Sequence, residues 1–168
     1  GALAGTWLVS GIIPTLIVYG LDLLSPSFFL PATVILCSIV SLATGSSWST
    51  TATIGIALMG VGQGLGFSPG LVAGAVISGA YFGDKMSPFS DTTNLAPAMA
   101  GAELTTHIRH MAWTSGPAWL IALVAFFFIG LGGSGGEMSD LSAMSAEIQE
   151  RFVISPWLLV VPLISISL

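Results

Sequence analysis

Long apolar runs without charge constrain the fold of this chain most strongly. Residues 28–43 and 117–131 carry no charged side chain, and Asp22 is the one charged residue before Asp84. Charged residues make up 7% of the chain, against about 25% in ordinary soluble domains. An α-helix needs about 20 apolar residues to cross the hydrocarbon core of a bilayer. The sequence therefore predicts an all-α membrane protein with several transmembrane helices.

Hydrophobic blocks alternate with polar segments along the chain. The blocks lie at residues 3–20, 28–43, 52–67, 70–82 and 113–131, and a sixth begins at 156. The glycine-rich and acidic stretch 132–155 is expected to be a solvated loop, with a short surface helix at 141–151. The chain starts without Met and ends soon after the sixth block begins. We therefore expect residues 1–168 to be one fragment of a longer transmembrane protein.

Glycines recur at a spacing of four residues, which lets transmembrane helices approach each other closely. The pairs are Gly62/Gly66, Gly70/Gly74 and Gly79/Gly83. Tight helix packing is the simpler interpretation, and direct contact of these glycines with a ligand is the alternative.

Composition also excludes several kinds of site. The single Cys37 permits no internal disulfide and no metal-binding cysteine set. A net charge of −5 argues against nucleic acid as a partner. No cofactor motif is present in the sequence.

The segment 83–97, G-D-K-M-S-P-F-S-D-T-T-N-L-A-P, is a dense polar cluster in an otherwise apolar chain. Ionisable groups at membrane depth are costly and usually mark an ion or substrate path. Pro88 and Pro97 each remove a backbone donor and disfavour helix at the preceding residue. We therefore expect non-helical backbone in the middle of the cluster, and a role in cation transport.

The oxygen-bearing side chains of this cluster are the candidate ion and proton ligands, since hard cations prefer oxygen. They are Asp84, Ser87, Ser90, Asp91, Thr92, Thr93 and Asn94. Asp91 is favoured as the Na⁺ ligand because polar residues surround it. Asp84 is then a partner of Lys85 or a second proton carrier. Lys85 is either an internal counter-charge or an interfacial lysine whose ammonium group reaches water.

A second polar segment, T-G-S-S-W-S-T-T at residues 44–51, separates two apolar blocks. It is either a functional break inside a helix or a simple loop with Trp48 at the membrane interface. Unwound backbone within a membrane is tolerated where it is buried in protein or lines a watery cavity. The candidate ligands here are Thr44, Ser46, Ser47 and Thr50. The 83–97 cluster has the same simpler alternative, because Asp, Ser, Pro and Asn are also turn residues.

Two of these segments carry a family resemblance. The runs A-T-G-S-S-W-S-T-T-A-T-I-G-I-A-L-M-G at 43–60 and G-A-Y-F-G-D-K-M-S-P-F-S-D-T-T-N-L-A-P-A at 79–98 closely resemble the NhaC-type Na⁺/H⁺ antiporters. The segments 5–15 and 106–111 are similar too, so the likeness covers essentially the whole chain. The motif at 79–98 is long enough to be highly specific.

The resemblance implies a multi-pass antiporter of the bacterial cytoplasmic (inner) membrane, built from inverted repeats with broken or re-entrant helices. This fragment would belong to the first half, and the remaining half of the transporter would be its partner, together with lipid, Na⁺ and H⁺. Whether the protein forms a homo-oligomer stays open. The same family includes organic-acid antiporters of the malate/lactate type, and the motif does not separate these substrates.

Exchange is expected to follow from competition of Na⁺ and H⁺ for one carboxylate. Burial favours the neutral form of a carboxyl group, and a bound cation favours the ionised form. Two other functions fit less well. An intramembrane aspartyl protease needs two facing carboxylates, and Asp22 is the one acidic residue before Asp84. A passive channel would also use polar breaks, but it needs no proton-coupled carboxylate.

Overall fold

The computed structural model describes residues 6, 9–23, 26–132, 149–152 and 154–160. Every regular element in these ranges is helical. In chain order they are α2 (Ile12–Leu23), α3 (Pro26–Thr44), α4 (Ser47–Thr50), the π-helix η1 (Thr51–Gly55), α5 (Ile56–Gly64), α6 (Pro69–Met86), α7 (Asp91–Ala100), α8 (Leu104–Gly132) and the 3₁₀-helix η2 (Pro156–Leu159). The expectation of an all-α protein is confirmed for this part of the chain. Most of the expected 132–155 loop and its surface helix lie outside the described residues.

Two of the described helices, α3 and α8, are long and apolar enough to cross a membrane. The helix α6 extends to Met86 and is longer than the apolar block at 70–82 from which it was expected. It continues because Asp84 and Lys85 are compatible with helical backbone, and the helix ends only before Pro88, which disfavours helix at Ser87.

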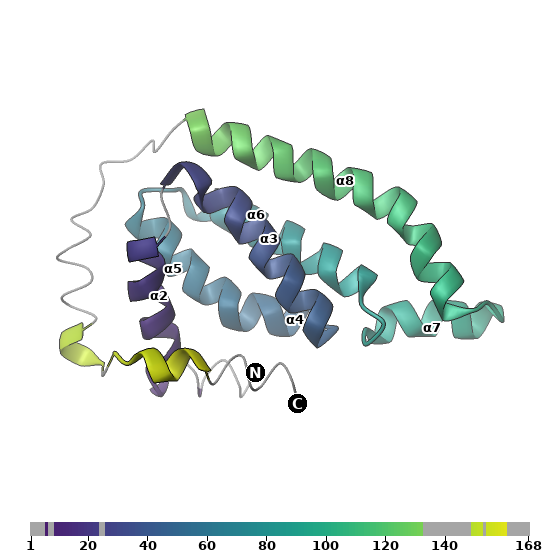
Figure 1. The fold of residues 1–168 in the computed structure, drawn as a ribbon, viewed down its shortest axis with the longest axis horizontal. Coiled ribbons are helices and arrows are strands. Elements are labelled where there is room, and N and C mark those ends of the chain that lie inside the picture. Colours follow the sequence, from purple (N-terminus) through teal and green to yellow (C-terminus); the bar gives the residue numbers. More distant parts are fainter. Residues whose placement is uncertain (1–5, 7–8, 24–25, 133–148, 153, 161–168) are drawn as a thin grey trace.

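The helix α3 packs most extensively against α6, and α8 lies along both of them (Figure 1). The helix α7 lies at one end of this group and α2 at the other, beside α5. Between them, α4, η1 and α5 continue as one helical path back toward α2 (Figure 1).

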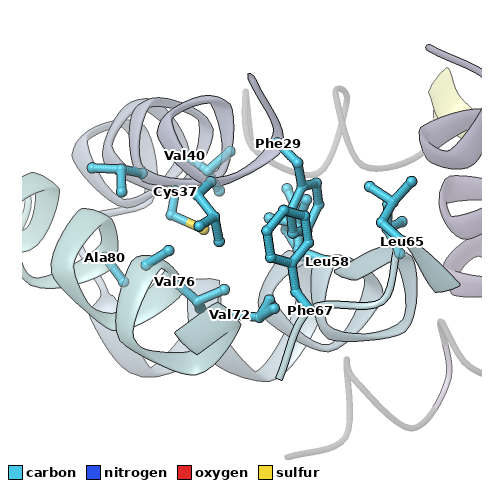
Figure 2. Packing of buried hydrophobic residues seen from close by; sticks show 14 residues of the cluster. Phe29, Cys37, Val40, Leu58, Leu65, Phe67, Val72, Val76 and Ala80 are labelled. Carbon is cyan, nitrogen blue, oxygen red and sulfur yellow. The ribbon is translucent and has the colours of Figure 1, made fainter. Parts of the chain in front are cut away.

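The core lies between α3, α5 and α6. Figure 2 shows Phe29, Cys37 and Val40 of α3 opposite Val72, Val76 and Ala80 of α6, with Leu58, Leu65 and Phe67 completing the cluster. The rings of Phe29 and Phe67 stack with their centroids 5.5 Å apart. Glycine makes the α3–α6 contact close: a Cβ atom on Gly79 or Gly83 would overlap the backbone carbonyl oxygen of Val34 or Ser38. For this pair, the interpretation of the glycine spacing as tight helix packing is confirmed.

The two polar segments are less unwound than the sequence suggested. In the 44–51 segment, non-helical backbone is confined to Gly45 and Ser46, because Ser46 caps a new helix and its Oγ accepts from the backbone N–H of Ser49 at 3.2 Å. In the 83–97 segment it is confined to residues 87–90. The expectation of non-helical backbone in the middle of this segment is confirmed, while Pro97 is buried inside α7. A proline at that position removes one backbone hydrogen bond, which bends a helix without necessarily ending it.

Candidate functional site

The structure brings the two polar segments together. The turn at Gly45 lies against the backbone of Phe89, so close that a Cβ atom on Gly45 would be 2.6 Å from the Phe89 carbonyl carbon. Gly45 also has a φ of +68°, a conformation that glycine adopts without strain. The buried hydroxyl of Ser87 donates to the Leu42 carbonyl oxygen at 2.7 Å. The site is therefore built where α3 ends, α4 begins and α6 ends.

The loop between α6 and α7 is held by its own polar groups. The Ser87 N–H donates to the Asp84 carbonyl oxygen at 3.2 Å, and the Ser90 N–H donates to the Ser87 carbonyl oxygen at 3.3 Å. Ser90 then caps α7, with its Oγ accepting from the Thr93 N–H at 3.5 Å. Pro88 fits this turn because it has no N–H to satisfy.

Asp84 occupies the centre of the junction. Its Oδ2 accepts a hydrogen bond of 2.9 Å from Ser47 Oγ, a residue of the first polar segment. Its Oδ1 is buried and has no hydrogen-bond partner among the described residues. A buried polar atom without a partner is costly and calls for a physical explanation, such as a bound ion. One lone-pair-rich oxygen of this carboxylate is thus available to a proton or a cation.

Asp91 has a different environment. It is exposed at the first residue of α7, and its Oδ1 accepts from the neighbouring Thr92 N–H at 2.7 Å. A carboxylate in the first turn stabilises a helix by interacting with the helix dipole. Within the described structure, Asp91 therefore has a structural role that Asp84 lacks.

The remaining candidates of the 83–97 cluster mostly stabilise the loop. Thr93 Oγ1 lies 3.2 Å from the carbonyl oxygens of both Asp84 and Lys85. Asn94 Nδ2 donates to the Pro88 and Ser90 carbonyl oxygens, each at 2.7 Å. The hydroxyls of Ser90 and Thr92 pair with each other at 2.9 Å. These residues hold the end of α6 at a fixed position.

Among the candidates of the 44–51 segment, Ser47 is the one whose side chain hydrogen-bonds to α6 in the described structure. Thr50 Oγ1 donates to the Ser46 carbonyl oxygen at 2.9 Å, and the hydroxyls of Thr44 and Thr50 are 3.5 Å apart. Ser46 acts as the helix cap of α4. Ser47 thus links the two segments, while its neighbours shape the turn.

Lys85 does not provide the counter-charge to the free oxygen of Asp84 in the described structure. Its side chain is exposed and lines a pocket between α6 and α8, together with Ser115 and Trp119. Among the described residues, Ser47 donates a hydrogen bond to Asp84 Oδ2, and Asp84 Oδ1 has no partner.

Sequence reasoning missed several residues that position the site. Ser41 Oγ donates to the Ala80 carbonyl oxygen at 2.5 Å, one turn before Asp84. Trp119 of α8 donates from Nε1 to Ser38 Oγ at 2.9 Å and stacks on Phe82 with centroids 4.9 Å apart. Hydroxyl residues inside an apolar helix are the one signal that could have drawn attention to Ser38 and Ser41.

A family model described as the Na⁺/H⁺ antiporter family matches residues 79–168 of this chain. The match begins in α6 and includes Asp84 and the whole loop that follows it. No solved structure matches the chain.

Several proteins named as antiporters are similar to this chain. It is 45% identical over its whole length to the Na⁺/H⁺ antiporter NhaC of Alkalihalophilus pseudofirmus, covering 36% of that protein. It is 46% identical over 95% of its length to the malate-2H⁺/Na⁺-lactate antiporter of Bacillus subtilis, covering 35%. It is 40% identical over 88% of its length to the arginine/ornithine antiporter ArcD of Halobacterium salinarum, covering 30%.

The chain thus spans about a third of the length of the relatives that it matches. The family model covers more than half of the chain, 79–168 of 168 residues. The segment that contains the Asp84 carboxylate and the α6–α7 loop is therefore a family segment, and this chain belongs to the Na⁺/H⁺ antiporter family.

Proposed function

We propose that this chain is the part of a Na⁺/H⁺ antiporter that carries a site at which Na⁺ and H⁺ compete. The observation that carries the proposal is the Asp84 carboxylate, which accepts one hydrogen bond from Ser47 and keeps one buried oxygen without a partner among the described residues. The membrane in question is the bacterial cytoplasmic membrane, and the protein is a transporter rather than an enzyme.

Competition follows from the chemistry of a single carboxylate. A protonated carboxyl group has lost the negative charge that attracts a cation, so Asp84 can hold H⁺ or Na⁺ but not both. A protein that changes between inward-open and outward-open states with either ion bound exchanges one for the other. Ser47 presents its oxygen to Na⁺ and donates its hydroxyl hydrogen to Asp84 when the site is empty.

We assign the principal site to Asp84, with Ser47 as its co-ligand. The polar residues of the α6–α7 loop position the end of α6, and Asp91 stabilises the start of α7. Further ligands belong to the remainder of the transporter, because transporters built from inverted repeats place ion sites between the repeats. Thr44 and Thr50 are additional oxygen donors on the same turn.

The experiment that tests the proposal uses the full-length parent in everted vesicles with an imposed proton gradient. Addition of Na⁺ is expected to collapse the gradient, read by a fluorescent reporter of internal pH. Vesicles without the transporter are the control. Failure of Na⁺ to change internal pH would contradict Na⁺/H⁺ exchange.

A second candidate function is sodium- and proton-coupled exchange of organic acids. The relative from Bacillus subtilis favours it, since that protein is named for malate and lactate. The same vesicles distinguish the two functions: a response that requires added malate or lactate supports organic-acid exchange, with Asp84 then serving the coupling ion.

The Ser47→Ala variant is expected to weaken Na⁺ binding. Removal of the hydroxyl takes away the oxygen that Ser47 presents to Na⁺, and a polar interaction with a charged group contributes about 1.5–3 kcal/mol. The KM for Na⁺ should therefore rise roughly tenfold or more in vesicle assays. Ser49→Ala is the matched control, because Ser49 is exposed in the same short helix. Equal KM values for the two variants would contradict the role of Ser47.

The KM for Na⁺ is also expected to depend on pH. If protons and Na⁺ compete for Asp84, the KM rises in proportion to proton concentration on the acid side of the profile, while the maximal rate at saturating Na⁺ changes less. Initial rates measured over a series of pH values check this. A KM independent of pH would exclude competition at one site.

A further inference from the structure

A pocket of about 260 Å³ lies between α6 and α8, with the stacked rings of Phe82 and Trp119 in its wall. The two helices run antiparallel, since the chain passes from the end of α6 through α7 to the start of α8 (Figure 1). The volume is slightly below the roughly 300–1,000 Å³ of pockets that enclose a whole small molecule. The pocket therefore suits one part of a larger molecule that extends beyond it.

The pocket is polar at one end and mostly apolar along its length. Lys85, in the last turn of α6, and Ser115 of α8 line the polar end. Ala118 and Ala122 line the wall further along α8. Ser78 lies opposite them, but its Oγ donates to a carbonyl oxygen of its own helix at 2.7 Å. A ligand with a polar head and an apolar tail matches this arrangement.

The polar end lies close to the level at which two helices leave the membrane. Of the described helices, α3 and α8 are long and apolar enough to cross it. The end of α3 lies beside the end of α6, since Ser87 donates to the Leu42 carbonyl oxygen, and the apolar block of α8 begins at Trp113. Trp and Tyr side chains gather at membrane–water interfaces, and Trp113 and Tyr81 are 79% and 50% exposed. Lys85 is therefore at the depth of lipid headgroups.

The charge of the pocket favours an anion. Lys85 is the one charged side chain among the residues described as lining it, and none of them is a carboxylate. The adjacent Asp84 is directed to α4, where its Oδ2 accepts from Ser47. Lysine binds phosphate groups as a point charge, and basic residues next to transmembrane helices attract anionic lipids. The exposed Lys85 ammonium group is thus available to a phosphate.

We propose that the pocket between α6 and α8 binds an anionic phospholipid. The headgroup phosphate lies at Lys85 and Ser115, and one acyl chain lies along α8 over Ala118 and Ala122, whose small side chains leave room for it. This inference goes beyond the proposed function, because the lipid stays bound at the protein surface and is not transported.

Native mass spectrometry of the purified full-length parent, titrated with dioleoyl phosphatidylglycerol, measures this binding. The first molecule is expected to bind about fivefold more tightly than dioleoyl phosphatidylcholine, which has the same acyl chains but a positive charge in its headgroup. One lysine beside an anionic lipid accounts for a factor of this size. Equal affinity for the two lipids would overturn the proposal, and is the result expected if the remainder of the transporter fills the pocket.

Lys85→Gln should remove the preference for phosphatidylglycerol, and Lys85→Arg should keep it. Arg109→Gln is the matched control, because Arg109 is also exposed and lies near the start of α8, but it is not among the residues that line the pocket. This control loses the same charge and should keep the preference. An equal loss in Lys85→Gln and Arg109→Gln would show a general attraction to basic residues and would overturn the site.

Ala122→Trp tests the apolar part of the pocket. The larger side chain should fill the space of the acyl chain and weaken phosphatidylglycerol binding, whereas Ala125→Trp, at an exposed position of α8 outside the pocket, should not. Free glycerol phosphate, the headgroup without acyl chains, should not displace the lipid. Equal lipid binding by the two tryptophan variants, or displacement by glycerol phosphate, would rule out a lipid as the occupant.

Discussion

Asp84→Asn in the full-length parent is expected to abolish Na⁺-dependent proton movement. Asparagine has nearly the same shape and can still accept a hydrogen bond from Ser47, so the junction between α4 and α6 should remain folded. It carries no negative charge and cannot exchange a proton near neutral pH. Loss of about 3 kcal/mol of charge-assisted binding alone lowers Na⁺ affinity roughly 100-fold. Everted vesicles with a fluorescent reporter of internal pH measure the effect.

Asp91→Asn is the matched control, since it is the other carboxylate of the polar cluster. Asparagine is also favoured near helix N-termini and can accept from the Thr92 N–H. This variant should therefore retain most of the exchange activity. The opposite pattern, with exchange lost in Asp91→Asn and kept in Asp84→Asn, would move the ion ligand to Asp91, as the sequence alone had favoured. Membrane levels of both variants, measured by immunoblot, exclude a loss of protein.

Gly79→Ala and Gly83→Ala are expected to destabilise the fold strongly. The new Cβ atoms would overlap backbone of α3, the Val34 carbonyl oxygen in one case and the Ser38 carbonyl oxygen in the other. Backbone atoms cannot move aside as a flexible side chain can, so α3 and α6 must separate. Overpacking of this kind costs about 3 kcal/mol, the upper end of the usual range. Thermal unfolding of the full-length parent in detergent checks the loss.

Gly74→Ala on the same helix is the control for these two variants. A Cβ atom there would lie 3.6 Å from the nearest atom, Phe126 Cζ, which is ordinary van der Waals contact. Alanine also has the higher helix propensity, by roughly 0.8–1 kcal/mol. Gly74→Ala should therefore be neutral or slightly stabilising. A similar loss of stability in all three variants would show that α3 and α6 do not pack through Gly79 and Gly83.

Local sequence features predicted the positions of both polar segments and the non-helical backbone in the middle of the 83–97 segment. Pro88 located the end of α6 well, because a proline restricts the residue before it. Pro97 also disfavours helix at the residue before it, yet α7 continues through it. The serine- and threonine-rich 44–51 segment left a broken helix and a loop open. The structure contains a short turn there, in which Gly45 adopts a positive φ and Ser46 caps the next helix.

The choice between the two aspartates could not be made from the sequence. Asp91 has more polar neighbours along the chain, but those side chains bond to the loop and to each other in the described structure. The donor to Asp84 is Ser47, which lies 37 residues away in sequence. No pattern of neighbouring residues in the sequence predicts such a contact, because the contact depends on how α3, α4 and α6 pack.

The sequence by itself determined the all-helical membrane class, the place of the polar cluster and the antiporter family. The length of an apolar run and the spacing of glycine and proline determine structure over a few residues, so the sequence alone reveals their effects. Only the tertiary structure joined the two polar segments and gave Asp84 a partner for one oxygen and none, among the described residues, for the other. The physical reason is that the environment of a carboxylate is set by groups within a few ångströms in space, wherever they lie in the chain.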